Sequence, residues 1–256
     1  MRITALLSLH QLGYSFASTS EKPVLSHLSL EAYAGEFVSI IGASGSGKST
    51  LFKLIAGLLQ PSQGEIRLRG KPAPDRLGKI AYMPQLDLLL PWRTVLENCL
   101  LPLELARGNQ LTGISRITEL LEHFGLAGYE HAYPDELSGG MRQRVAFLRT
   151  LVTGQELLLL DEPFGALDAM TKRGMQKWLL ELWGSLQKTV LFITHDLEEA
   201  ILLSDRIYLL SGNEPQGVQE IIVKLPRPRH YELNYEPEFV MLRQDLERRL
   251  HAQTAF

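Results

Sequence analysis

The sequence predicts an α/β fold with a mainly parallel sheet. Strand-like segments alternate with segments of helical periodicity, and a glycine-rich turn joins a strand at residues 36–41 to a helix from about residue 48 to 58. Strands that alternate with helices form parallel sheets whose two faces are covered. With 256 residues, 45% of them hydrophobic and 21% charged, the chain can bury a substantial core.

The first sixteen residues are read as an alternating strand that runs into Leu12, Tyr14 and Phe16. The short apolar run after Arg2 also allows a signal peptide. Further strands are expected at residues 25–30, 65–68, 79–83, 157–160, 189–194 and 206–210.

From about residue 86 to 149 the pattern is helical, with apolar residues at spacings of three and four. This predicts a helical insertion in the α/β core. Beyond residue 211 we expect a strand at 221–223, an exposed turn at 225–229 and an amphipathic helix at 238–251. The apolar side of that helix either packs on its own domain or meets a membrane surface or a regulator.

Composition excludes several classes of function. The formal net charge of −3 disfavours a protein that coats nucleic acid, because neutralising phosphates requires an excess of Lys and Arg. A single cysteine, Cys99, cannot form an intramolecular disulfide or a cysteine-based metal site, and it fits a reducing cytosol. No stretch reaches the roughly 18 consecutive apolar residues that a bilayer crossing needs.

A phosphate-binding loop lies where the strand hands over to the helix. The motif comprises Gly42, Ala43, Ser44, Gly45, Ser46, Gly47, Lys48, Ser49 and Thr50. Its glycines let successive backbone N–H groups face one anion, and the helix N-terminus adds a positive dipole. Lys48 is expected to neutralise the outer phosphates of ATP, and the Ser49 hydroxyl to ligate Mg²⁺. A flexible Gly/Ser linker would not place Lys-Ser-Thr between a strand and a helix.

An acidic pair follows four leucines at residues 157–160. Asp161 is expected to reach Mg²⁺, and Glu162 to position and deprotonate the attacking water. Taken alone, the acidic pair could be a solvated strand end, but the presence of a phosphate loop in the same chain favours a catalytic role.

A second anion-binding helix start follows Leu137. Ser138, Gly139 and Gly140 precede a helix, although alone they could be an ordinary serine N-cap. In this context the segment resembles the signature motif of ABC ATPases. The resemblance implies a P-loop NTPase (RecA-like) core with an antiparallel N-terminal β portion and a helical insertion. It also implies a head-to-tail dimer, in which these three residues cover the γ-phosphate held by the other copy.

Other landmarks of the family appear in order. Gln85 matches the Q-loop glutamine, which meets Mg²⁺ and links the core to the helical insertion, and Asp168 matches the D-loop at the dimer interface. His195 matches the switch histidine, which donates to the γ-phosphate and aligns the water. Phe16 falls where an aromatic ring stacks on adenine, with Tyr14 as the alternative. The catalytic residues implied are therefore Lys48, Gln85, Glu162 and His195.

The resemblance extends to the importers of nitrate, sulfonates, taurine and thiamine precursors, through residues 89–98, 141–146 and 161–168. It implies an ATPase domain at 1–211, with a helical subdomain at about 86–149, and a C-terminal extension at 212–256. The implied partners are a second ATPase subunit, identical or related, transmembrane permease subunits and, indirectly, a solute-binding protein, with no nucleic acid. The implied location is the cytoplasmic face of the bacterial plasma membrane. An exporter or lipid-extraction ATPase and a non-transport ABC clamp are the alternatives.

The apolar run from Leu88 to Trp92 has two interpretations. It could form an apolar groove that receives a cytoplasmic helix of the permease. It could instead cap the core of the helical insertion.

Overall fold

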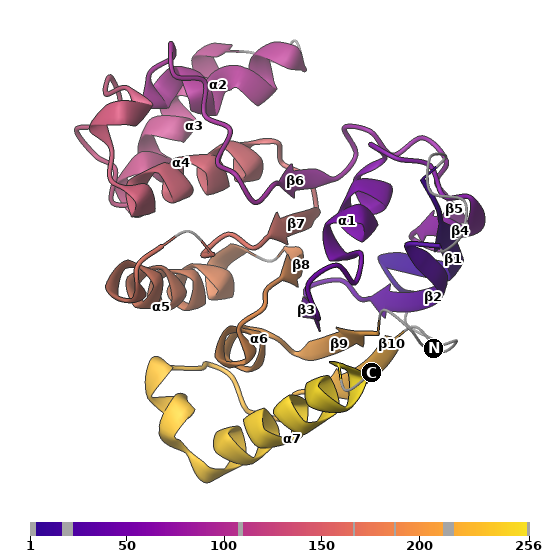
Figure 1. Ribbon diagram of the computed structural model, residues 1–256. Coiled ribbons are helices and arrows are strands. Elements are labelled where there is room, and N and C mark those ends of the chain that lie inside the picture. Colours follow the sequence, from indigo (N-terminus) through magenta and orange to yellow (C-terminus); the bar gives the residue numbers. More distant parts are fainter. Residues whose placement is uncertain are drawn as a thin grey trace.

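The computed structural model describes residues 4–16, 23–106, 110–165, 167–186, 188–211 and 218–254. Within these ranges a six-stranded sheet occupies the centre of the molecule, and a four-stranded sheet lies beside it (Figure 1). Ala166 of the expected D-loop and Gly212 to Gly217 lie outside the described residues.

The central sheet has the strand order β10-β9-β3-β8-β7-β6. Every neighbouring pair runs parallel except β10 with β9. Both faces are covered, so β7 and β8 are buried along their whole length and are continuous apolar runs rather than alternating ones. The strands are β3 (Phe37–Gly42), β6 (Ala81–Met83), β7 (Leu157–Asp161), β8 (Thr189–Ile193), β9 (Arg206–Leu210) and β10 (Val218–Ile222).

The second sheet is antiparallel, in the order β2-β1-β4-β5. Its strands are β1 (Leu7–Tyr14), β2 (Leu25–Ala32), β4 (Gln63–Leu68) and β5 (Lys71–Pro72). The strand expected near the N-terminus is present, but its alternation is broken where the register shifts between Leu9 and Leu12 and Gln11 adopts a φ of 49°. Phe16 lies beyond the end of β1. The two sheets together confirm the predicted fold class.

Helices α2, α3 and α4 gather at one end of the molecule (Figure 1). Thr94 and Glu97 start α2 with a reciprocal capping box, in which each side chain accepts from the other's backbone N–H. In the described ranges, no helix combines the length and the apolar character that a bilayer crossing demands. The helices are α1 (Lys48–Ala56), α2 (Val95–Leu105), α3 (Gln110–His123), α4 (Gly139–Val152), α5 (Ala169–Leu186), α6 (Leu197–Leu203) and α7 (Pro237–Thr254), with short 3-10 turns at Pro134–Glu136 and Tyr231–Tyr235.

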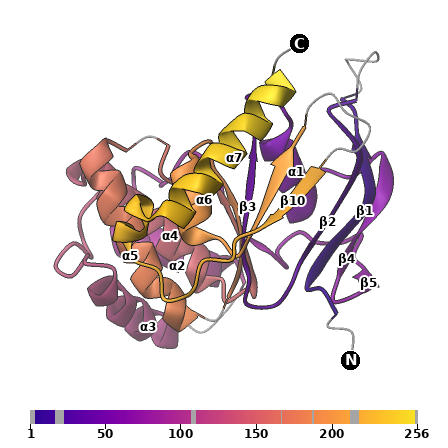
Figure 2. The same ribbon diagram turned by 90° about the horizontal axis from the view of Figure 1, so that it is seen from below.

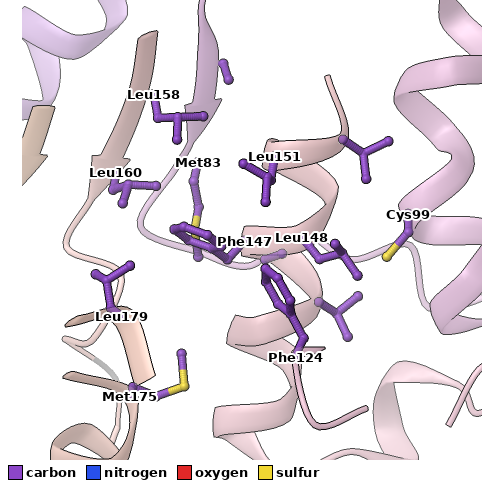
Figure 3. Close-up of a cluster of buried hydrophobic side chains, with 14 of the residues drawn as sticks. Met83, Cys99, Phe124, Phe147, Leu148, Leu151, Leu158, Leu160, Met175 and Leu179 are labelled. Carbon is purple, nitrogen blue, oxygen red and sulfur yellow. The ribbon is translucent and has the colours of Figure 1, made fainter. Parts of the chain in front are cut away.

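One hydrophobic core joins these helices to the edge of the central sheet. Figure 3 shows the buried side chains of β6, β7, α4 and α5 that meet there, among them Met83, Leu160 and Leu151. The rings of Phe124 and Phe147 pack edge-on against Trp178 of α5, with centroid separations of 4.7 and 5.4 Å. Helix α4 therefore has its place fixed by the core.

The C-terminal helix is present as expected and covers α6 (Figure 2). Phe239 and Leu246 are fully buried against α6, with Leu242 and Leu250 partly buried beside them. The apolar side of α7 is thus used within the chain. The preceding turn is held by Arg229, whose buried guanidinium donates to the carbonyls of Ile201, Leu202, Ser204 and Leu225.

The ring of Phe147 is central to the core described above, so Phe147→Ala is expected to lower the free energy of unfolding by about 3–5 kcal/mol. Urea denaturation followed by tryptophan fluorescence measures the change. Met241→Ala is the control, because Met241 is 68% exposed on α7, and it should shift stability by less than about 0.5 kcal/mol. Equal small effects of the two substitutions would show that this core does not hold α4 in place.

Candidate active site

The turn between β3 and α1 is tight, and two of its glycines have no substitute. A Cβ atom at Gly42 would lie 2.6 Å from the carbonyl oxygen of Leu210, because β9 pairs directly beside it. Gly47 adopts a φ of 88°, and a Cβ there would lie 2.8 Å from Leu25. Helix α1 then begins at Lys48 and directs its N-terminus toward the turn.

Lys48 curls back over this turn. It is only 8% exposed, and its Nζ donates to the carbonyls of Gly42 at 2.8 Å and Ala43 at 2.9 Å. Burial lowers the pKa of Lys48, while the carboxylates of Glu162 and Asp161 act in the opposite direction. A positive charge is thereby held at the floor of the turn.

A cavity of about 500 Å³ opens above the turn. From the far side, Gln85, Glu162 and His195 complete its wall. Its other lining residues are Val24, Gly42, Ser44, Gly45, Gly47, Lys48, Ser49 and Thr50. The cavity therefore brings together most of the phosphate loop with three residues from the distant motifs.

Asp161 lies at the end of β7 and is 2% exposed. The Ser49 hydroxyl donates to one of its carboxylate oxygens and the Tyr82 hydroxyl to the other, each at 3.3 Å. Burial raises the pKa of Asp161, and the hydrogen bonds from Ser49 and Tyr82 oppose that shift. Burial also raises the pKa of Tyr82, which keeps its hydroxyl protonated as a donor.

Glu162 is the point at which three motifs converge. Its Oε2 accepts from Gln85 Nε2 at 3.2 Å and lies 3.5 Å from His195 Nδ1. Its backbone N–H donates to the carbonyl of Ile193 at 2.9 Å, which ties it to β8. Its φ of 46° is uncommon for a residue other than glycine, and it aims the carboxylate at the cavity instead of along the strand.

The donor set suits a hard cation shared with a phosphate. In the part of the chain that the structure describes, no three His, Cys, Asp or Glu side chains cluster to hold a metal alone. Ser49 and Asp161 instead offer two neighbouring oxygens at the mouth of the phosphate loop. Nearby, the buried Ser46 Oγ has no hydrogen-bond partner, so the loop also holds an unused polar group.

Ser138, Gly139 and Gly140 are not part of this cavity. Ser138 caps α4, where its hydroxyl accepts from Met141 N at 3.3 Å, and it is exposed. Asp168 similarly caps the start of α5, where hydrogen bonds from Thr171 lower its pKa. The two capping side chains are therefore exposed, and neither lines the cavity over the phosphate loop of its own chain.

The aromatic residues expected at adenine also lie outside the cavity lining. Phe16 is 44% exposed and packs edge-on against Tyr14, with ring centroids 5.0 Å apart. Val24 lines the cavity instead. Sequence reasoning missed Val24, and it missed Tyr82, whose hydroxyl reaches Asp161 only because β6 pairs in parallel with β7.

Comparison with known proteins agrees with the motifs. Residues 25–165, more than half of the chain, match the family model described as ABC transporter. The chain is 46% identical to the formylaminopyrimidine import ATP-binding protein ThiZ of Halalkalibacterium halodurans, over 86% of each protein. It is 42% identical to the nitrate import ATP-binding protein NrtD of a Synechocystis strain, over 84% of this chain and 83% of that one. It is 41% identical to the taurine import ATP-binding protein TauB of Yersinia pestis, over 90% and 92%.

Solved structures give the same result. A dimeric structure of the bacterial ABC transporter cassette MJ0796 superposes with a TM-score of 0.74 at 32% identity, over 86% of this chain and all of that one. A second structure of that cassette, described as a dimeric post-hydrolysis state bound to ADP and Pi, has the same TM-score at 31% identity. The cavity over the phosphate loop, the family match and these relatives together show that the chain belongs to the ABC transporter family and is one of its ATP-hydrolysing subunits.

Proposed function

We propose that this chain is the ATPase subunit of a bacterial ABC importer, and that two copies close on ATP to drive a separate permease. The solute class we favour is nitrate, a sulfonate, taurine or a thiamine precursor, because relatives named for nitrate, aliphatic sulfonates, taurine and formylaminopyrimidine share 41–46% of their residues with this chain. The observation that carries the proposal is the convergence of Gln85 and His195 on Glu162 at the wall of the phosphate-loop cavity.

ATP binding falls to the residues of the turn. Backbone N–H groups from Gly45 to Ser49 and the N-terminus of α1 face the phosphates, and Lys48 exchanges its two carbonyl partners for phosphate oxygens. Ser49, Asp161 and Gln85 would hold Mg²⁺, which supplies charge neutralisation at the terminal phosphates. Either Phe16 or Tyr14 would reach adenine from the edge of the antiparallel sheet.

Hydrolysis requires a base that is held in place. Glu162 accepts the proton of the attacking water, and Gln85 fixes one of its carboxylate oxygens by a hydrogen bond. His195 lies beside the same oxygen, where its ring can donate to the γ-phosphate and align the water. A carboxylate fixed on one side is left with few orientations, so little reorganisation is needed during reaction.

The second half of each site would come from the other copy. Ser138 is exposed at the start of α4, Gly139 is half-buried and Gly140 is buried, and none of the three lines the cavity of its own chain. An accessible helix N-terminus favours an anion. The dimeric cassette to which this chain is similar supports a pairing of this kind. Closure then depends on the γ-phosphate bridging the two copies, and hydrolysis removes the stabilisation of the closed state.

The permease would contact the surface that follows Gln85. Leu86, Leu88 and Trp92 are 70%, 57% and 71% exposed, whereas Leu89 is buried in the helical core. Leu89 thus packs in the core of the helical insertion, whereas Leu88 and Trp92 are available to a partner. A partner at the cytoplasmic face of the membrane would cover the exposed ones.

The same surface is tied to α4. Arg149 donates to the backbone carbonyls of Leu88, at 2.8 Å, and Asp87. At the other end of α4, Arg142 pairs with the Asp87 carboxylate at 3.4 Å and donates to the carbonyl of Leu137. Movement of the permease-facing loop would therefore be passed to α4, the helix that Ser138 caps.

Glu162→Gln removes the proton acceptor but keeps the shape of the side chain. Steady-state ATP turnover is expected to fall by about 10²- to 10⁴-fold, with ATP binding retained and a stable dimer formed with ATP. Phosphate release and light scattering after size-exclusion chromatography measure the two effects. Glu119→Gln, on the exposed face of α3, is the matched control and should behave as wild type. Undiminished turnover in the Glu162→Gln protein would rule out this carboxylate as the base.

Reconstitution with an importer permease and its solute-binding protein tests the transport function. ATP turnover should rise severalfold with one of the solutes named above and with no unrelated solute. Trp92→Ala should abolish that stimulation while leaving the turnover of the isolated chain within about twofold of wild type, because buried aromatic anchors dominate interfaces. Met241→Ala removes an equally exposed apolar side chain on α7 and should keep the stimulation. Failure to assemble with any permease would favour a non-transport clamp, and stimulation only by an exported compound or lipid would favour an exporter.

A further inference from the structure

A buried polar network lies directly behind His195, and neither the catalytic proposal nor the sequence motifs use it. At its centre is Glu199 on α6, which is 2% exposed. One of its carboxylate oxygens accepts from Lys172 Nζ at 2.9 Å and from Gln176 Nε2 at 3.1 Å. The other accepts from the hydroxyl of Thr194.

The network forms hydrogen bonds with Thr194 and Asp196, the two sequence neighbours of His195. The Thr194 hydroxyl, besides donating to Glu199, accepts from the backbone N–H of Asp196 at 3.0 Å. The Asp196 carboxylate accepts from the N–H groups of Glu198 and Glu199 at the start of α6, at 2.8 and 3.3 Å, and from Lys172 Nζ at 2.8 Å. The residue on each side of the histidine is therefore held by hydrogen bonds.

His195 itself has little packing that could orient it. Its side chain is 61% exposed, and its ring lies 3.5 Å from the Glu162 carboxylate. An exposed ring takes its position mainly from the backbone that carries it, and a shift of about 1 Å at a reacting group can cost a hundredfold in rate. The orientation of the ring thus depends on the network behind it.

The cation of the network comes from a different part of the chain. Lys172 and Gln176 are four residues apart on α5, so they lie on the same face of that helix. The helix begins at Ala169, directly after Asp168, which caps it. The network consequently joins the helix that follows the expected D-loop to the segment that carries the histidine.

The charges make the network sensitive to any single change. Two carboxylates, Asp196 and Glu199, share one ammonium group. Burial raises the pKa of Glu199, against the hydrogen bonds from Thr194 and Lys172. Burial would lower the pKa of Lys172, but its bonds to Asp196 and Glu199 outweigh this and raise it. Removing one partner leaves the other groups incompletely paired and free to rearrange.

We propose that Lys172 and Glu199 are positioning residues for ATP hydrolysis, which hold the His195 segment in register with α5 so that the ring meets the attacking water. This inference rests on the proposed role of His195 in the reaction. Gln176 and Thr194 complete the hydrogen bonds of the Glu199 carboxylate, and Asp196 passes the restraint to the backbone.

The test separates kcat from KM. Glu199→Gln and Lys172→Met are each expected to lower kcat for ATP by about ten- to a hundredfold, with KM and nucleotide binding within about twofold of wild type. Lys172→Arg keeps the charge and the donors and should recover most of the kcat lost in Lys172→Met. Because the two residues act on the same segment, the double variant should lose little more than either single variant.

A matched control separates positioning from stability. Glu36→Gln weakens another half-buried ion pair, with Arg206, at the opposite end of β3 from the phosphate loop. Glu36→Gln should lower the melting temperature by about as much as the network variants do, while leaving kcat within about twofold of wild type. If kcat falls in Glu36→Gln as much as in the network variants, or stays at the wild-type value in both network variants, the proposal is overturned.

His195→Ala, measured in parallel, distinguishes this inference from the proposed function. Lost turnover in His195→Ala together with intact kcat in Glu199→Gln and Lys172→Met would refute the network alone. Full turnover in His195→Ala would refute both the catalytic role of the histidine and the inference that depends on it.

Discussion

The shared edge of three parallel strands is the constraint on which the rest of the site depends. Strand β8 lies between β3 and β7, and all three strands run in the same direction. Their carboxyl ends therefore deliver Lys48, Glu162 and His195 to one rim, although the three residues are far apart in the sequence. The backbone bond from Glu162 to Ile193 fixes β7 and β8 in register at that rim. A phosphate loop at the end of β3 and a base at the end of β7, two strands away in the sheet, follow from this geometry.

The helical part of the chain places α4 relative to the sheet and to the loop after Gln85. Helix α4 is anchored to the sheet by the core around Phe147 and to the loop after Gln85 by Arg149. Ser138, which caps its N-terminus, nevertheless does not line the cavity over the phosphate loop of its own chain. If each copy is to complete the nucleotide site of the other, the start of α4 must lie outside the cavity of its own chain. Neither copy can then close a site alone.

Sequence reasoning recovered the sheet and the convergence of the main motifs, because these depend on local patterns and on the geometry of parallel strands. It did not find Tyr82 or the network around Glu199, because their hydrogen bonds join segments whose spacing in the sequence carries no signal. It did not single out Val24, which lines the cavity, and the contact of Phe16 with adenine stays a prediction. Leu89 and Trp92 were treated as one run, whereas the fold buries the first and exposes the second.

The central claim is that two copies share each nucleotide, and one structure tests it most directly. The Glu162→Gln protein should be crystallised or imaged with ATP and Mg²⁺, so that the closed state persists. The account predicts that the Ser138 hydroxyl and the N-terminus of α4 of one copy contact the γ-phosphate held by Lys48 of the other. A nucleotide-loaded structure in which Ser138 faces solvent, or any surface other than a partner's phosphate loop, would contradict it.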